Sequence, residues 1–233
     1  MRAVAYAISA IVLIALAAMP AVRAQDVSSP AVHIVTYIEA APASAQENAT
    51  LLKQFADASR KEAGLLRFEV LARAGRPGHF AIVASWKDQA AADAHAATGH
   101  NKQFYEKLTP SLIAPVDDRV CNTITVGPVQ AVAPAGAVFV MTHVDIAGPN
   151  PQNRDAMIPV LKAFGESSRN VAGNLRYDVL QQTSRTNHFQ VVEAWKDQKS
   201  DDDHESSAAN KAYRAKVGTL QGALYDQRWY TAL

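Results

Sequence analysis

Two histidines and a tryptophan stand at a spacing that could support acid–base chemistry on an aromatic compound. Trp86 is followed by His95 and then by His100, in the pattern W-x8-H-x4-H. A histidine can take a proton from a substrate near neutral pH, because its unperturbed pKa lies there. We therefore identify His95 and His100 as candidate catalytic residues and Trp86 as a candidate for substrate binding.

Two arginines on predicted strands could also reach a substrate. Arg67 and Arg176 alternate with apolar neighbours, so each side chain lies on the sheet face opposite to those neighbours. On that face they either line a pocket or pair with Glu69 and Asp178. Every candidate for substrate binding could likewise serve packing or pairing instead. These candidates are Trp86, Arg67, Tyr37, His143, Trp195, Arg176 and His204.

The chain carries the same pattern twice. Residues 79–102 and 188–211 align without a gap at an offset of 109 residues, and the alignment extends upstream to Phe55 and Phe164. A repeat of this length is a whole small domain rather than one unit of a solenoid. The identical pairs include His79/His188, Trp86/Trp195, Lys87/Lys196, Asp88/Asp197, His95/His204 and Asn101/Asn210.

The two repeats are not equivalent at the candidate site. Ala209 stands in repeat two where repeat one has His100, and Glu193 stands where repeat one has Ala84. The second helix of repeat two begins with the acidic run 201–205, which favours an exposed helix start. We expect one working site, in repeat one, and a mainly structural partner.

Each repeat shows the signals of strand, helix, strand, strand, helix and strand in that order. Apolar and charged residues alternate over 66–70, which is typical of a strand. Ser44 and Glu47 predict a capping box at the first helix. Gly99 predicts a break in the second helix. Pro159 predicts that the first helix of repeat two is bent or starts later than its counterpart.

This order of elements is the ferredoxin-like arrangement, a four-stranded antiparallel sheet with two helices on one face. The strands carry apolar side chains on both faces, and the sheet of the other repeat is the simplest cover for the second face. We therefore predict an α+β fold. Two tandem ferredoxin-like (βαββαβ) domains, 31–126 and 137–233, flank a linker at 127–136. Their sheets form an intrachain pseudo-dimeric α/β barrel.

The first 24 residues have the pattern of a signal peptide. Arg2 precedes an apolar run from Ala3 to Ala18, and small residues stand before a cleavage position after Ala24. The run is too short to span a bilayer, which needs about 20 residues. We expect a periplasmic or secreted protein with no stable membrane anchor after cleavage.

Charge and cysteine usage exclude other classes. Without Arg2 and Arg23 the chain has 21 basic and 22 acidic residues, so it lacks the basic footprint of a nucleic-acid-binding protein. The single cysteine, Cys121, cannot form an internal disulfide, and its β-like apolar surroundings favour a buried thiol. The sequence leaves open whether the chain associates further with itself.

Residues 85–100, SWKDQAAADAHAATGH, resemble the antibiotic biosynthesis monooxygenase (ABM) domain of the dimeric α/β-barrel superfamily. Residues 193–204 match that pattern partly, and the resemblance covers 31–126 and 137–232. It implies oxidation of a small aromatic, quinol or phenolic compound with O2, without flavin or metal. It also implies a dry pocket, a histidine base, and Arg67 or Trp86 as donor to a quinone oxygen.

No cofactor is predicted, because no G-x-G-x-x-G motif for flavin or nicotinamide follows a strand. No metal site is predicted either. The leading hypothesis is an exported, cofactor-independent monooxygenase of the quinol or polyketide type. Two alternatives stay open. One is a non-catalytic small-ligand-binding or structural module, and the other is haem binding or degradation, suggested by the helix histidines.

Overall fold

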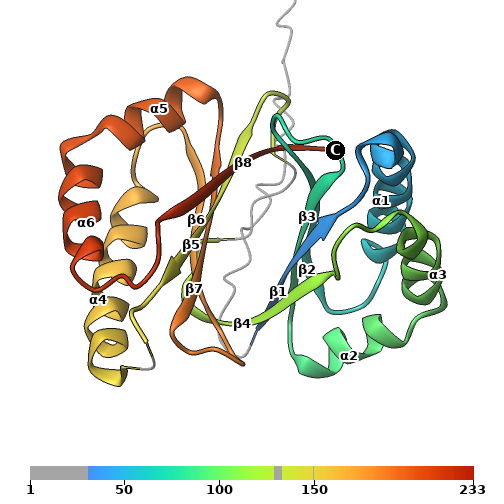
Figure 1. Cartoon of the computed structure of the whole chain (residues 1–233), viewed down its shortest axis with the longest axis horizontal. Coiled ribbons are helices and arrows are strands. Elements are labelled where there is room, and N and C mark those ends of the chain that lie inside the picture. The colour runs from blue at the N-terminus through green and yellow to red at the C-terminus, as the bar shows by residue number, and fades with distance from the viewer. Residues whose placement is uncertain (1–30, 129–132, 149) are drawn as a thin grey trace, which may run out of the picture.

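The computed structural model of the chain describes residues 31–128, 133–148 and 150–233. The expected signal peptide and part of the expected linker lie outside these residues. Within them, the predicted order of strand, helix, strand, strand, helix and strand occurs twice. Figure 1 shows two helical layers, one from each repeat, on opposite sides of a central set of strands.

In repeat one the predicted break in the second helix is confirmed. Thr98 has extended backbone angles, and its hydroxyl oxygen accepts a hydrogen bond from the Asn101 N–H. The predicted capping box is wrong, because Ser44 ends a short 3-10 turn with near-helical angles and makes no side-chain cap bond. The elements are β1 (Val32–Glu39), α1 (Ala45–Ser59), β2 (Leu65–Arg73), β3 (His79–Trp86), α2 (Gln89–Ala97), α3 (Gly99–Leu108) and β4 (Asp117–Thr125).

Repeat two follows the same plan. Its first helix contains Pro159 and begins at Pro151, so the alternative of a later start is wrong. Asn150 caps that helix by accepting a hydrogen bond from the Gln152 N–H. The elements are β5 (Val138–Asp145), α4 (Pro151–Ser168), β6 (Asn174–Gln182), β7 (His188–Trp195), α5 (Gln198–Ser206), α6 (Ala208–Gly218) and β8 (Asp226–Ala232).

The strands form one closed barrel in the order β1-β3-β2-β8-β5-β7-β6-β4. The two repeats join edge to edge. Leu71 of β2 pairs with Ala232 of β8, and Cys121 of β4 pairs with Gln182 of β6, both antiparallel. Closure leaves no free sheet edge. The predicted fold class is confirmed: two ferredoxin-like repeats make a pseudo-dimeric α/β barrel within one chain.

Alternation along the strands divides the core into layers. One face of β1–β4 packs under the helices of repeat one with Phe55 and Trp86, and the corresponding face of repeat two packs with Trp195. The opposite faces fill the barrel interior, which contains Tyr37 and Cys121. The thiol is buried, as predicted. Within the described residues, no helix combines the length and apolar character needed to cross a membrane.

Candidate active site in repeat one

A cavity of about 220 Å³ lies in repeat one between the sheet and its helices. Phe55, Phe68 and Ile82 supply apolar walls from α1, β2 and β3. The side chains of Ala84 and Ala92 also line the cavity, and their small size leaves space between these apolar walls. Such a mostly apolar space with a few polar groups is typical of a site for a small organic molecule.

Polar groups gather on the side of the cavity formed by α3 and β4. Asp118 and Val120 line the cavity and are exposed, so the cavity meets solvent along β4. The Thr36 hydroxyl donates a hydrogen bond to the Asp118 carboxylate. Burial raises the pKa of the neighbouring Tyr105 phenol, with a further contribution from the Asp118 charge. Tyr105 therefore stays neutral. Asp118 also lines the cavity, and its side-chain oxygens can accept a hydrogen bond from a ligand hydroxyl.

His95 is held in a fixed orientation beside the cavity. Its Nδ1 donates to a Glu62 carboxylate oxygen at 2.7 Å, and its Nε2 accepts from the Asn101 side-chain amide at 3.1 Å. The Trp86 and Phe55 rings pack against the imidazole, with centroids 4.7 and 5.5 Å away. This assignment of the ring proton follows from the partners. A carboxylate that orients a histidine is the usual arrangement of a general base.

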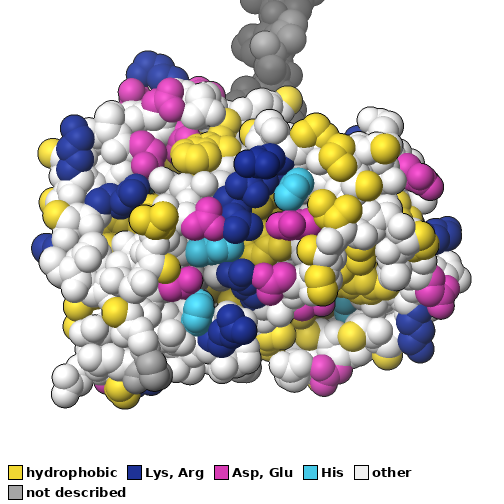
Figure 2. Space-filling view, in the orientation of Figure 1, with side chains coloured by type: hydrophobic (Ala, Val, Ile, Leu, Met, Phe, Trp, Pro, Cys, Tyr) yellow, Lys and Arg dark blue, Asp and Glu magenta, His cyan; other side chains and the backbone are white. Residues whose placement is uncertain are grey.

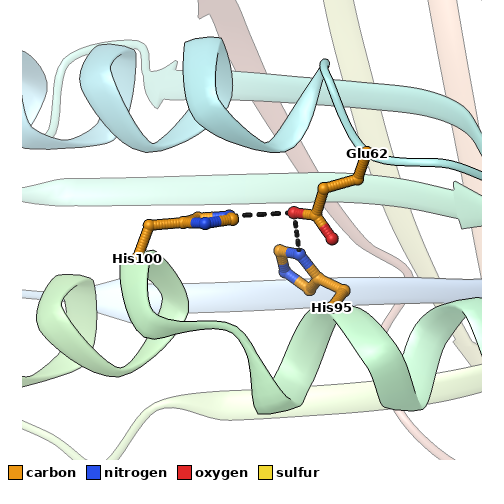
Figure 3. A group of neighbouring side chains, drawn as sticks. All are labelled: Glu62, His95 and His100. Atoms are coloured by element: carbon orange, nitrogen blue, oxygen red, sulfur yellow. Dashed lines mark hydrogen bonds and ion pairs between the residues drawn. The ribbon is translucent and has the colours of Figure 1, made fainter.

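His100 approaches the same carboxylate from the other side. Its Nε2 lies 2.8 Å from the Glu62 oxygen that His95 also contacts, as Figure 3 shows. The His100 side chain is 31% exposed and does not line the cavity. It lies instead beside a smaller hollow between α1 and α3. The geometry separates the two candidate catalytic histidines, and only His95 reaches the cavity.

Trp86 brings an unused hydrogen-bond donor to the cavity wall. The residue is fully buried, and its indole N–H has no hydrogen-bond partner among the described residues. A buried donor without a partner costs about 1–3 kcal/mol, so such groups are rare unless a ligand or water satisfies them. The donor is therefore available to an acceptor atom of a bound molecule.

Repeat two closes the equivalent space with its own side chains. Glu193 stands at the position of Ala84, and one of its carboxyl oxygens accepts a hydrogen bond from the Trp195 indole N–H at 3.1 Å. Asp201 stands at the position of Ala92 and accepts from the Trp229 indole N–H at 2.8 Å. Burial raises the pKa of Glu193 well above its usual 4.5. These larger groups occupy the positions that leave the cavity open in repeat one.

His204 is the counterpart of His95 in a different environment. Its Nε2 pairs with the Ser168 hydroxyl at 3.1 Å, and Val171 stands where repeat one has Glu62. Burial lowers the pKa of His204 to about 4. The Trp195 ring packs against it at 4.5 Å. Trp195 and His204 therefore belong to the filled core of repeat two rather than to the cavity of repeat one.

Arg67 and Arg176 lie inside the barrel, away from the cavity. Arg67 pairs with Asp178 at 2.7 Å, and Arg176 pairs with Glu69 at 2.6 Å. Of the two alternatives for these arginines, pairing with the acidic residues is confirmed. The pairs are crossed, so each arginine contacts a carboxylate of the other repeat. They connect the two halves of the barrel.

Tyr37 and His143 meet at another place in the barrel. The Tyr37 hydroxyl donates to Gln190 and receives a hydrogen bond from His143 Nε2, both at 2.8 Å. Arg119 and Arg228 lie 5.0 and 5.4 Å from the Tyr37 ring centroid. Burial and these cations lower the pKa of His143 to about 3. This pair faces the barrel interior and does not line the cavity.

Basic, acidic and histidine side chains gather at the centre of the face shown in Figure 2, between the two helical layers. Salt bridges of 2.6 Å join Arg119 to Asp117 and Arg228 to Asp226, each within one strand. Each of the two arginines that face Tyr37 therefore has an acidic partner on its own strand. Arg119 and Arg228 pack against the Tyr37 ring.

The family model for antibiotic biosynthesis monooxygenases matches residues 31–107 and again residues 140–216. The chain belongs to this family. Each ABM match lies within one repeat. "Putative monooxygenase YcnE" of Bacillus subtilis is 30% identical over 81 residues, which cover 35% of this chain and 85% of that protein.

Solved structures share the tandem ABM fold along most of their length. A protein described as a "putative monooxygenase" from Fusobacterium nucleatum has a TM-score of 0.79 at 16% identity, covering 87% of this chain and 92% of its own. An "anthrone oxidase-like protein" has a TM-score of 0.68 at 11% identity, covering 89% and 93%. At these identities the likeness establishes the fold of the tandem ABM domains.

Glu62, Asp118 and Asn101 are among the polar residues of this candidate site that were not predicted from the sequence. Glu62 lies 33 residues before His95, in the turn after α1, and no local pattern connects the two. Asp118 comes from the last strand of the repeat. Asn101 has an asparagine, Asn210, at the equivalent position of the second repeat, and this identity was the signal in the sequence that could have indicated it.

Proposed function

We propose that repeat one is a cofactor-independent monooxygenase for a small phenol or quinol. The observation that carries the proposal is one cavity that combines three features. It has aromatic walls, the carboxylate-oriented His95, and the unpartnered N–H of Trp86. Repeat two fills the equivalent space with Glu193 and serves the barrel as a structural partner.

The cavity size limits the substrate. Its volume of about 220 Å³ lies below the roughly 300–1,000 Å³ of pockets for drug-sized ligands. We therefore expect a compact molecule of at most three fused rings. Haem, with four pyrrole rings in one plane, does not fit this space beside His95, which disfavours the haem alternative.

The residues can divide the chemistry between them. His95 Nε2 accepts the phenolic proton when the substrate hydroxyl replaces the Asn101 amide as its partner, and Glu62 stabilises the resulting imidazolium. The Trp86 N–H donates to the developing anionic oxygen of the substrate. In repeat two a Glu193 carboxyl oxygen takes the matching place beside Trp195, so an oxygen acceptor suits this position.

The electron-rich anion then transfers electrons to O2. One oxygen atom enters the substrate and the other leaves as water. A quinol therefore becomes a hydroxyquinone, or a methylene between two aromatic rings becomes a carbonyl, and in both cases two hydrogen atoms of the substrate leave as water. The substrate itself supplies the electrons. The apolar walls from α1, β2 and β3 limit the contact of the anion with bulk water to the side along β4.

We also propose that the chain is exported and acts after cleavage behind Ala24. The support is the pattern of Arg2, the apolar run and the small residues before Gln25. Mass spectrometry of the mature protein, after expression of the whole gene, checks the cleavage position. An N-terminus at Met1 or Arg2 in the exported fraction contradicts it.

O2 uptake by the purified chain from Gln25 onward tests the activity. The substrates are menadiol-type quinols and anthrone-type phenols, with autoxidation subtracted, and labelled O2 followed by mass spectrometry counts the oxygen atoms incorporated. We expect His95→Gln to lower kcat by about 10²–10⁴-fold, the usual contribution of a general base. His100→Ala should lower it less, because His100 does not line the cavity.

The matched control is His188→Gln, which alters a histidine–carboxylate pair far along the chain from the cavity. Its rate should equal that of the unaltered protein. Tight binding of these compounds without O2 consumption or product would instead support the alternative of a non-catalytic binding module.

A further inference from the structure

Glu62, His95 and His100 form a compact set of metal-ligand atoms. Their ligand atoms lie within 4.8 Å of one another, and within residues 31–128, 133–148 and 150–233 they are the one such group of three. Figure 3 shows that Glu62 comes from the turn after α1, His95 from α2 and His100 from the start of α3. Three separate segments therefore converge on one point.

The fold does not require this cluster. Repeat two has the same helices, but Val171 and Ala209 stand at the positions of Glu62 and His100. The proposed oxygenation does not require all of it either, because His100 lies outside the cavity lining. Neither the fold nor the proposed oxygenation therefore explains why Glu62, His95 and His100 occur together.

Two imidazole nitrogens and one carboxylate oxygen are a donor set that suits Zn²⁺. Metal–ligand distances of about 2.0–2.1 Å in a tetrahedral site place neighbouring ligand atoms roughly 3.3 Å apart. The Glu62 oxygen now lies 2.7 and 2.8 Å from the two nitrogens, so it must retreat by roughly half an ångström. Glu62 and His100 are partly exposed, which permits that movement and leaves a coordination position for water.

The surroundings of His95 suit a metal ligand. Metal-bound histidines usually donate their second ring N–H to an oxygen acceptor, which fixes the ring. The Asn101 amide lies 3.1 Å from His95 Nε2, and a flip of that amide presents its oxygen to an N–H at this position. The Trp86, Phe55 and Phe68 rings hold the imidazole in place.

We infer that repeat one binds one divalent transition-metal ion of the Zn²⁺ type through Glu62, His95 Nδ1 and His100 Nε2. The ion replaces the proton shared in the Glu62–His95 contact, and water completes its coordination. If the proposed oxygenation also holds, bound Zn²⁺ inhibits it, because a metallated His95 carries its remaining proton on Nε2 and cannot act as the base there.

Isothermal titration of ZnCl2 into the untagged, EDTA-treated and dialysed chain tests the site without any substrate. We expect one ion per chain with micromolar or tighter affinity. His100→Ala and Glu62→Gln should each weaken binding by at least about 10-fold. Titration with Co²⁺ should give an intense visible absorption band for a four-coordinate site, and His100→Ala should abolish it.

The matched control is His188→Ala. His188 also contacts a carboxylate, Asp145, at 2.7 Å, but no second imidazole joins that pair in the described chain. Its Zn²⁺ affinity should be unchanged. Circular dichroism checks that each variant is folded. If Glu62→Gln does not fold, His100→Ala decides the test, because His100 is partly exposed and its loss disturbs the fold less. The inference is overturned by absence of Zn²⁺ binding, by full binding in His100→Ala, or by an equal loss in His188→Ala.

Discussion

Trp86 and Trp195 occupy equivalent positions in the two repeats, yet their indole N–H groups differ in partnership. Trp195 donates to a Glu193 carboxyl oxygen at 3.1 Å, whereas the buried N–H of Trp86 has no partner in the described part of the chain. Ala84 replaces Glu193 in repeat one, and the cavity opens beside the free donor. The difference between Ala84 and Glu193 therefore decides whether the tryptophan N–H faces an open cavity or a side-chain acceptor.

Trp86→Phe keeps an aromatic ring but removes the free donor. We expect ligand affinity to fall by about 0.5–1.5 kcal/mol, the net contribution of one hydrogen bond, which is roughly a 2- to 12-fold loss. Loss of the indole N–H should change the free energy of unfolding little, because this N–H makes no hydrogen bond that the variant would lose. Titration of a quinol analogue followed by fluorescence or calorimetry measures the affinity, and unchanged affinity would exclude a role for the N–H.

Trp195→Phe makes the same change in repeat two with the opposite pattern of effects. It leaves the buried Glu193 carboxyl without its donor, which should cost about 1–3 kcal/mol of unfolding free energy. Ligand affinity should be retained. Urea unfolding of the two tryptophan variants side by side checks this, and equal stability losses would contradict the difference in partnership.

Asp178→Ala should destabilise the barrel strongly. Asp178 is buried, pairs with Arg67 at 2.7 Å across the two repeats and accepts from the Gly127 N–H. Removal of one partner of a buried pair costs about 3–5 kcal/mol, because the Arg67 charge stays buried without its directly contacting carboxylate.

Chemical denaturation monitored by circular dichroism measures this cost. Asp57→Ala is the control, because Asp57 forms an exposed pair with Arg60, and exposed pairs contribute only about 0–1 kcal/mol. A loss for Asp178→Ala no larger than that of Asp57→Ala would show that the crossed pairs do not hold the halves together.

Glu193→Gln should change how stability depends on pH. Burial raises the pKa of Glu193 above its ordinary 4.5, so between these pKa values the folded chain binds more protons than the unfolded chain. The contribution of Glu193 to stability is therefore complete below about pH 4.5 and declines as pH rises toward the folded pKa. Glutamine keeps an acceptor for Trp195 and has no proton to lose.

The stability of Glu193→Gln relative to the unaltered chain should accordingly rise from pH 4 to pH 8. Urea midpoints measured at several pH values give this difference. A difference that is constant over the whole range would mean that the folded state does not favour the protonated carboxyl.

The repeat made most of the fold predictable from the sequence. The alignment of Trp86 with Trp195 implied two copies of one domain, and alternation in the strands implied a covered second face. Closure of the barrel through β2–β8 and β4–β6 supplies that cover by edge pairing. The failure at Ser44 arose because a local pattern cannot show that the preceding residues already turn.

The candidate site was only partly predictable. The W-x8-H-x4-H pattern placed Trp86 and His95 together because they lie on adjacent elements. The separation of His100 from the cavity depends on the turn at Thr98, which sets the direction of α3. Glu62 was missed because its contact with His95 is tertiary. The crossed partners of Arg67 and Arg176 depend on barrel closure, which no local pattern encodes.

The central claim is that the cavity of repeat one is the reaction site, and Ala84→Glu tests it most directly. This change gives Trp86 the partner that Glu193 gives Trp195, so the protein should stay folded while the cavity is filled. Ala97→Glu is the control, because Ala97 is exposed on the same repeat and does not line the cavity.

We predict that quinol-dependent O2 uptake persists in the unaltered chain and in Ala97→Glu and is lost in folded Ala84→Glu. Equal uptake by folded Ala84→Glu, or no uptake above autoxidation by the unaltered chain, would contradict the account.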